Sequence, residues 1–303
     1  MLRVERQASL LSSSSLTLPK PYNALLSFHT VPDAAEIIAL SRFGYRFIAD
    51  SGAFSVHNIG ATIDIEEYAQ WCRDIKGHVA WVASLDVIGN AAASYDNWLY
   101  LRGKGLDLVP TVHYPAPPQT LDRYADVDFV GLGGMVGIKD HQNVLRWLVS
   151  MFRYARDKYP SMKFHGWGCT GNRLVQQVPF YSIDSSGFSS GHRWGNFTLV
   201  DDVTGVRYSY TANGRDAYKY AKELQRLYNV SASEVAVSTP DNKHLVLYVA
   251  AKGSVNLQKF LRRRFGVIEA PTFGTDGKDG IHVHNVLTPD DYKVLKPTLK
   301  ETS

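Results

Sequence analysis

The chain has 303 residues, of which 45% are hydrophobic and 20% are charged, and its formal net charge is +4 at pH 7. This composition excludes a disordered or fibrous chain, and no apolar run approaches the roughly 18 residues that a membrane span needs. Its two cysteines, Cys72 and Cys169, cannot build a disulfide framework, so we expect a reducing, cytoplasmic environment and no membrane partner.

Short β-type runs alternate with helix-type segments from about residue 23 to residue 190. This alternation is typical of βαβ units that build a parallel sheet. Residues 1–22 precede it as a loose lead-in. The predicted strands cover residues 24–29, 45–50, 79–86, 108–114, 128–132, 163–168 and 180–184. An eighth strand is not located, and it is expected either in the first 22 residues or beyond Gly187.

Two helices between these strands have clear signals. Residues 64–76 begin with Asp64 and Glu67 at capping-box spacing, and the apolar face of this segment includes Cys72, which predicts a buried cysteine. Residues 140–159 carry a second apolar stripe at helical spacing. Helices of this regularity fit the outer ring of an α/β barrel.

The alternation ends after Gly187. Residues 197–202 and 206–210 predict a β-hairpin, and residues 216–227 predict a helix after it. A long helical region follows from about residue 231 to residue 265. We therefore predict a lead-in at 1–22, a catalytic barrel at 23–228 and a helical C-terminal extension at 229–303.

Three aspartates end predicted strands: Asp50, Asp86 and Asp184. Loops that follow the carboxyl ends of parallel strands converge on one face, so we expect these side chains to lie close together. One carboxylate that faces an anomeric carbon can act as a nucleophile while a second one moves the proton. The alternative for Asp50 is a structural role in an Asx turn or a helix cap.

A glycine-rich loop follows the fifth predicted strand, with the sequence G-L-G-G-M-V-G over residues 131–137. Glycines let the backbone approach a flat ligand and offer it N–H and C=O groups. A phosphate loop is the alternative, although the spacing and the late position differ from the dinucleotide-binding fingerprint. No nucleotide cofactor is therefore predicted.

Four motifs in order resemble those of the tRNA-guanine transglycosylase (queuine tRNA-ribosyltransferase) superfamily, over roughly residues 45 to 196. They are D-S-G-A-F-S at 50–55, G-G-M-V-G at 133–137, H-G-W-G-C-T at 165–170, and S-I-D at 182–184 followed by the basic loop G-H-R-W-G-N at 191–196. The sequence departs from the family motif at Ala53, where a glycine is usual, and at Ser55, where a glutamine is usual.

The resemblance implies a (β/α)8 TIM-like barrel and a role for each matching residue. Asp184 would attack C1′ of a nucleotide, Asp50 would serve the departing and incoming bases, and Asp86 would recognise the purine edge. His113 lies where a further base-contacting side chain is expected. The remaining implied substrate-binding residues are Ser51, Phe54 as a stacking ring, Gly133 and Gly134 through their backbone, and Arg193 near a phosphate or Asp184.

Members of this superfamily that act on tRNA usually carry a zinc subdomain with several cysteines, but residues 197–210 contain none. A zinc-free chain resembles the bacterial and phage branch that inserts 7-deazaguanines into DNA. The resemblance thus implies exchange of guanine in DNA for a base such as preQ0 (7-cyano-7-deazaguanine), with no nucleotide cofactor and no metal. The alternatives are a tRNA substrate, a nucleoside or glycoside hydrolase, and a noncatalytic nucleic-acid-binding protein. A partner protein that opens the duplex is compatible with the DNA hypothesis.

The densest basic cluster consists of Lys259, Arg262, Arg263 and Arg264 near the end of the long helical region. On a helix, these side chains can bind nucleic-acid phosphates, and a solvated helix end is the alternative. His282 and His284 have a spacing that metals use, but with so little support we do not predict a metal site there.

Overall fold

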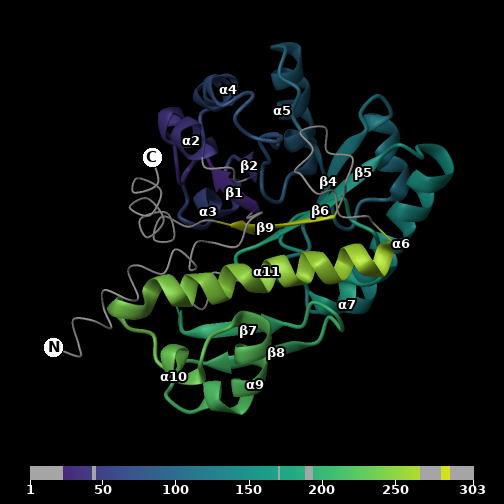
Figure 1. Cartoon of the computed structure of the whole chain (residues 1–303). Coiled ribbons are helices and arrows are strands. Elements are labelled where there is room, and N and C mark those ends of the chain that lie inside the picture. The colour runs from purple at the N-terminus through teal and green to yellow at the C-terminus, as the bar shows by residue number, and fades with distance from the viewer. Residues whose placement is uncertain (1–22, 43–45, 170, 188–193, 267–280, 287–303) are drawn as a thin grey trace.

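The structure is a computed structural model that describes residues 23–42, 46–169, 171–187, 194–266 and 281–286 (Figure 1). The predicted lead-in and Arg193 lie outside these residues. The described residues form a curled parallel sheet with helices on its outer side. A separate β-hairpin lies across the long helix α11 (Lys243–Phe265) from this sheet.

Seven parallel strands form the main sheet, in the order β2-β1-β9-β6-β5-β4-β3. Their bounds are β1 (Asn23–Ser27), β2 (Arg46–Asp50), β3 (Thr111–His113), β4 (Phe129–Gly133), β5 (Lys163–Gly166), β6 (Ser182–Ser185) and β9 (His282–Val286). Strand β9 comes from the predicted C-terminal extension, yet it lies between β1 and β6. The predicted extension therefore supplies a central strand of the main sheet.

The expectation of a closed (β/α)8 barrel is wrong. The sheet is a curled half-barrel, and its edge strands β2 and β3 are not paired with each other. Residues 79–86, predicted as a strand, make only isolated bridges, from Val82 to Ala49 and from Ala83 to Val109. Because this segment pairs at a single residue on each side, it forms no regular strand that would close the sheet.

The helices that surround the sheet include both clear predictions. Helix α4 begins after Asp64, which accepts hydrogen bonds from two backbone N–H groups of the first turn, and α6 begins after Asp140. Cys72 is buried on α4, as predicted. The helices of this part of the chain are α2 (Ala34–Ser41), α3 (Ala53–Asn58), α4 (Ile65–Asp74), α5 (Ala91–Gly103), η1 (Pro118–Tyr124), α6 (His141–Lys158) and α7 (Asn172–Val175).

Apolar side chains on the outer side of the sheet pack under these helices in two clusters. One cluster includes Phe164 of β5 and Met151 of α6, and the other includes Phe47 of β2 and Leu247 of α11. Fully burying such a side chain stabilises the fold by roughly 1.5 to 3 kcal/mol. Packing of the helices on the outer face therefore holds the sheet in its curled shape. The side chains of the inner face are free of this packing.

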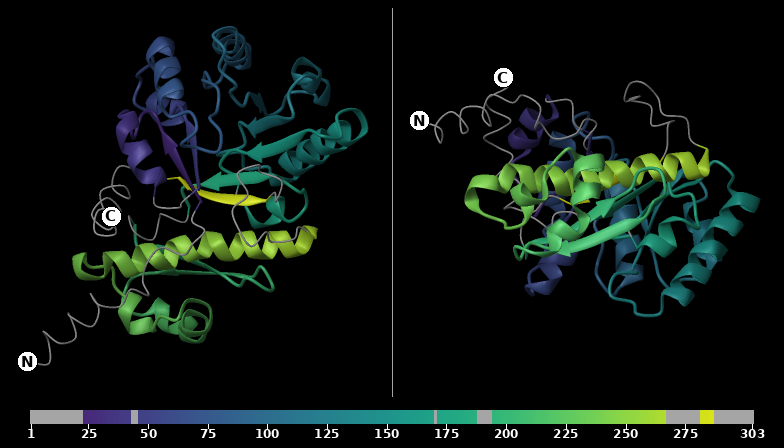
Figure 2. Two further views of the ribbon diagram at one scale, coloured as in Figure 1. Left: turned by 45° about the horizontal axis from the view of Figure 1, so that its top comes forward. Right: turned by 60° about the horizontal axis from the view of Figure 1, so that its bottom comes forward.

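The predicted hairpin is confirmed as the antiparallel pair β7 (Asn196–Val200) and β8 (Arg207–Thr211). Its apolar face packs with α11 and several short helices in a third core cluster. The left view of Figure 2 shows these elements on the far side of α11 from the main sheet. The helix predicted at 216–227 is divided into short pieces. The short helices are η2 (Asp216–Tyr220), α9 (Ala221–Glu223), η3 (Leu224–Tyr228), α10 (Ala232–Val235) and η4 (Pro240–Asn242).

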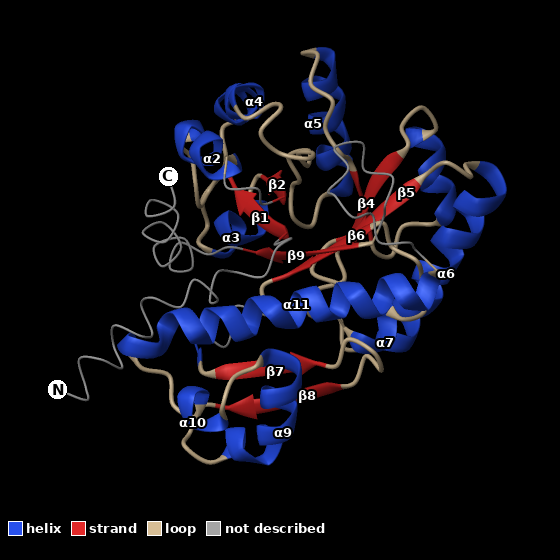
Figure 3. Cartoon of the chain, in the orientation of Figure 1, coloured by secondary structure: helices blue, strands red, loops and turns tan. Residues whose placement is uncertain are grey.

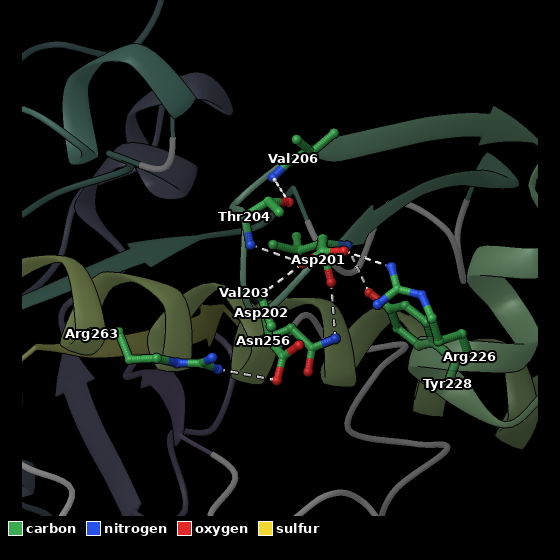
Figure 4. A network of polar contacts seen from close by, with 10 residues as sticks. Asp201, Asp202, Val203, Thr204, Val206, Arg226, Tyr228, Asn256 and Arg263 are labelled. Atoms are coloured by element: carbon green, nitrogen blue, oxygen red, sulfur yellow. Dashed lines mark hydrogen bonds and ion pairs between the residues drawn. The ribbon is translucent and has the colours of Figure 1, made fainter.

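Asp201 fixes the turn between β7 and β8 (Figure 4). Its carboxylate accepts hydrogen bonds of 2.9 Å from the N–H groups of Val203 and Thr204, and it pairs with Arg226 at 2.6 Å. Burial alone would raise the pKa of Asp201, but these donors outweigh burial and hold the pKa well below its usual range. The turn is therefore held by a charged side chain that is fully paired.

Two further contacts join this turn to α11 (Figure 4). Asn256 donates to the carbonyl of Val200 at 2.9 Å, and Arg263 pairs with Asp202 at 3.3 Å. Gly205 also lies against α11, because a Cβ at this position would be 2.5 Å from the ring of Phe260. The hairpin and the helix therefore pack with no room for an extra methyl group.

Gly205→Ala is expected to destabilise the protein by about 1 to 3 kcal/mol, because the methyl group would overlap Phe260. The φ angle of Gly205 is +70°, which adds strain for any side chain. Gly77→Ala is the matched control, since Gly77 has a φ of +85° and nothing within 4 Å of its Cβ position. Thermal unfolding should show the larger loss for Gly205→Ala, and equal losses would contradict the packing explanation.

Candidate active site

The curled sheet brings together the three aspartates predicted at strand ends. Asp50 ends β2, Asp184 lies in β6, and Asp86 follows the bridging segment between β2 and β3. The negative charges of Asp184 and Asp86 both act on the pKa of Asp50, so the three carboxyl groups lie within electrostatic range of one another. They form the centre of the candidate site.

Asp184 is buried and held by two N–H donors on one oxygen. Its Oδ1 lies 2.8 Å from the backbone nitrogen of Gly168 and 3.1 Å from Nε2 of His165. These bonds fix the orientation of the carboxyl group. No described residue donates a hydrogen bond to Oδ2, so this oxygen is the one available to a substrate.

His165 supports Asp184 as a neutral imidazole. Burial lowers the pKa of His165, and this effect outweighs the opposing effect of the Asp184 charge. Nδ1 of the same ring lies 2.7 Å from the Ser182 hydroxyl. When Ser182 donates to Nδ1, the ring carries its proton on Nε2 and donates it to Asp184. The contact between His165 and Asp184 is therefore a hydrogen bond and not an ion pair.

The surroundings of Asp50 favour its protonated form. Burial raises its pKa to about 8, and the charges of Asp184 and Asp86 contribute to the increase. The N–H of Gly52 donates to its Oδ1 at 3.1 Å and only partly offsets this effect. At neutral pH Asp50 therefore holds its proton, whereas Asp184 accepts two N–H donors. A protonated carboxyl group beside a second carboxyl group is an arrangement that acid and nucleophile pairs use.

Asp86 and His113 form a second polar pair at the site. Oδ2 of Asp86 lies 3.6 Å from Nε2 of His113. Burial would lower the pKa of His113, but the neighbouring carboxylate of Asp86 outweighs it, so the pKa is raised. Oδ1 of Asp86 and Nδ1 of His113 are buried without a hydrogen-bond partner. Unpaired buried polar atoms are costly, so this pair is suited to a ligand edge with matching groups.

The glycine loop is required by close packing at the end of β4. A Cβ on Gly133 would lie 3.0 Å from Thr111 and 3.2 Å from Trp167, and the carbonyl of Gly133 accepts a bond of 2.9 Å from Tyr114 N–H. Gly134 has a φ of +74° and is exposed. The packing explains the glycines without a ligand, and it leaves the backbone of Gly134 at the surface next to His113.

Aromatic rings fill the inside of the curled sheet. The ring centroids of Trp81 and His165 are 4.8 Å apart, and those of His165 and Trp167 are 4.2 Å apart. Trp167 also donates to the Thr111 hydroxyl at 3.1 Å. These rings keep water away from His165 and its bond to Asp184, which explains the strong effect of burial there.

His282 and His284 of β9 also lie in this interior, and among the described residues they belong to no group of three or more potential metal ligands. The ring nitrogens of His282 lie 3.0 Å from Arg46 and 3.3 Å from Arg262, so its surroundings are cationic. His284 is fully buried, and neither of its ring nitrogens has a hydrogen-bond partner. Burial and the neighbouring cationic groups hold the pKa of His284 well below its usual range.

His165 and His284 are expected to destabilise the fold progressively as the pH falls below about 6.5. In that range the unfolded chain takes up protons at these two residues, whereas burial opposes their protonation in the folded chain. His113 and Asp50 act in the opposite direction because their pKa values are raised. His284→Phe should therefore raise the free energy of unfolding at about pH 5.5 relative to its value at about pH 7.5, as measured by urea unfolding. An unchanged dependence would show that His284 does not contribute.

The other predicted site residues occupy mixed positions. Phe54 lies on α3 with 54% of its surface exposed, so its ring is accessible to a base. Ser51 is buried, and its hydroxyl accepts a hydrogen bond from the Ala53 N–H at 3.2 Å. Ser51 therefore shapes the turn after β2. The conformation of that turn sets how far the Ser51 side chain lies from a ligand.

The predicted phosphate-binding cluster on α11 is largely engaged within the protein. Arg262 is only 4% exposed and donates to the carbonyl of Ile281, so the alternative of a solvated helix end does not hold for this residue. Arg263 pairs with Asp202, and Arg264 donates to the carbonyl of Gln176 at 2.7 Å. Lys259 is half-buried. The physical reason is that this end of α11 is anchored to β9 and to the hairpin turn.

Sequence reasoning missed the polar support of Asp184. Both His165 and Gly168 lie within the motif at 165–170, but the sequence assigns no role to either of them. Their bonds reach a residue that is 19 and 16 positions away in the chain, so no local pattern identifies them.

A scan against protein-family models gives no match for this chain, and a search of curated proteins gives none. The resemblance to transglycosylases therefore rests on the four motifs. Among the residues that the structure describes, no helix is long and apolar enough to cross a membrane.

Proposed function

We propose that this chain is a base-exchanging transglycosylase that replaces guanine in DNA with a 7-deazaguanine such as preQ0. The observation that supports the proposal is a protonated Asp50 within electrostatic range of Asp184, whose side chain is held by two N–H donors. Exchange of a base needs a group that can both give and take a proton, and it needs a nucleophile that retains the sugar.

In the first half-reaction Oδ2 of Asp184 attacks C1′ of the target nucleotide. The bond between C1′ and N9 breaks, and its electron pair leaves with guanine. Asp50 gives its proton to the departing base, which leaves as neutral guanine. The sugar remains attached to Asp184 as an ester, while the N–H groups of His165 and Gly168 hold the other oxygen of this side chain.

In the second half-reaction the 7-deazaguanine base occupies the same site. Its N9–H gives a proton to the Asp50 carboxylate, and N9 attacks C1′. The ester bond breaks and returns its electron pair to Asp184. Both aspartates then have their starting protonation states, so the cycle consumes one base and releases one base with no net change in protons.

Base recognition is proposed for the polar pair next to this centre. The unpartnered Oδ1 of Asp86 can accept hydrogen bonds from the N–H groups on a guanine edge, and Nδ1 of His113 lies beside it. The exposed ring of Phe54 is suited to stacking on the base. A base inside a duplex must leave the stack first, at a cost of a few kcal/mol.

The test is to incubate the purified protein with DNA and preQ0, digest the DNA, and analyse its nucleosides by mass spectrometry. A 7-deazaguanine nucleoside is the expected result. Incorporation into tRNA but not DNA would support base exchange as the reaction and would refute DNA as the substrate. Release of guanine without incorporation would show a hydrolase that uses the same carboxylates, and no reaction on single-stranded or duplex DNA or on tRNA would contradict the proposal.

A further inference from the structure

The hairpin β7–β8 lies across α11 from the main sheet (Figure 3), and one of its faces has no part in the chemistry described above. Side chains alternate along each strand, and Phe197, Leu199 and Tyr210 point into the third core cluster. The opposite face is mostly polar, and its one apolar member, Val200, is the buried register partner of Arg207. The polar face consists of Asn196, Thr198, Arg207, Ser209 and Thr211, of which Asn196, Ser209 and Thr211 are exposed.

Arg207 stands out on the polar face because its guanidinium lacks partners. Its Nε and Nη2 atoms are buried and have no hydrogen-bond partner. These two nitrogens form one edge of the guanidinium, the arrangement that binds two oxygens of a phosphate or carboxylate at once. Two other arginines of this region are paired with carboxylates, Arg226 with Asp201 and Arg263 with Asp202.

The electrostatic surroundings of Arg207 also lack a counter-ion. Burial lowers the pKa of Arg207 to about 10, and the group that opposes this effect is the Cys169 thiol instead of a carboxylate. The thiol of Cys169 also senses the charge of Asp184, and the preceding residue, Gly168, donates its N–H to Asp184, so Cys169 lies near both groups. Arg207 therefore lies on the flank of the active site, beyond the end of β5.

We propose that Arg207 binds a backbone phosphate of the nucleic-acid strand whose base enters the active site. The choice of a nucleic acid rests on the proposed function. Arginine and hydroxyl side chains are common partners of phosphate oxygens, and Thr198, Ser209 and Thr211 share the polar face with Arg207. Trp194, which is 71% exposed just before β7, can stack on a base of the same strand.

The binding test compares Arg207→Gln with Arg156→Gln, which removes the same charge from an exposed position on α6. Each protein is titrated against a labelled single-stranded oligonucleotide with one guanine, without any 7-deazaguanine, at several salt concentrations. Arg207→Gln is expected to weaken binding about tenfold and to reduce the slope of log K against log salt by about 0.7. The control should change neither quantity, and an unchanged affinity and slope in Arg207→Gln would overturn the proposal.

Thermal unfolding separates a binding role from a structural one. Removing a buried charge that lacks a partner should leave the melting temperature equal or higher in Arg207→Gln. A lower melting temperature together with weaker binding would show that Arg207 supports the fold, and it would overturn the proposal. Arg207→Lys keeps the charge but loses the two-donor edge, so it should restore the salt slope but only part of the affinity.

Two further measurements complete the test. One distinguishes free phosphate from a phosphate of the nucleic-acid strand, and the other distinguishes failure of the Arg207 proposal from failure of the proposed function. If inorganic phosphate stabilises the wild type through Arg207 while oligonucleotide affinity does not depend on Arg207, the site binds free phosphate and the strand assignment is overturned. Base exchange is measured in parallel with preQ0. Exchange by the wild type with normal strand binding by Arg207→Gln would refute the Arg207 proposal alone. Binding that depends on Arg207 without any exchange would refute the proposed function alone.

Discussion

Asp184→Asn is expected to reduce base exchange by about a thousandfold or more while the protein stays folded. Asparagine keeps an Oδ1 atom that can accept the hydrogen bonds from Gly168 and His165. The amide group that replaces Oδ2 is not a nucleophile, so no ester with C1′ can form. The loss should appear in kcat with little change in the affinity for single-stranded DNA.

The measurement for Asp184→Asn is the nucleoside assay together with a search for the covalent intermediate. Without an incoming base, the wild type should form a protein–DNA adduct that survives denaturing electrophoresis, and the variant should form none. Asp157→Asn is the matched control, because Asp157 is an exposed carboxylate on α6. Near-normal exchange by Asp184→Asn would remove Asp184 from the mechanism, even if the nucleosides formed are those expected.

The order of strands explains which parts of the site were predictable. Asp50 and Asp184 each end a short apolar run, and the alternation of strands and helices is enough to place such ends on one face. The helix starts at Asp64 and Asp140 were predictable for a similar reason, since N-caps depend on neighbouring residues. Local patterns therefore located the carboxylates.

The remaining features depend on contacts that no local pattern encodes. Whether the sheet closes depends on the pairing of residues 79–86, and only single bridges form there. The strand β9 has two histidines facing the interior and follows a long helix, so its central place between β1 and β6 was not evident. Arg262 resembled a surface charge in the sequence, but the packing of α11 on β9 buries it.

Exchange activity is expected to fall above about pH 8, because Asp50 must hold a proton to release guanine. The pKa of Asp50 is raised to about 8, first by burial and then by the charges of Asp184 and Asp86. A plot of kcat/KM against pH should therefore decline with an apparent pKa near this value. Asp50→Asn cannot donate a proton, and its residual activity should not show this decline.

The same residue should affect stability in the opposite direction. In the unfolded chain the pKa of Asp50 returns to about 3.8, so between pH 3.8 and pH 8 the folded chain holds a proton that the unfolded chain has lost. The free energy of unfolding is therefore reduced progressively as the pH rises through this range, and the full penalty is present above pH 8. Asp50→Asn should raise the melting temperature, and it should do so more at pH 9 than at pH 5.5.

These two readouts separate catalysis by Asp50 from a structural role in the turn after β2. The structural alternative uses the bond from the Gly52 N–H to Oδ1 of Asp50, and asparagine can keep that bond. If the turn is the whole role, Asp50→Asn keeps its activity at every pH. A variant that is more stable at alkaline pH yet inactive requires that the charge of Asp50 is costly to the fold and that its proton is needed for turnover. Only a proton-transferring residue meets both conditions, because a turn-forming residue has no reason to be retained at a cost in stability.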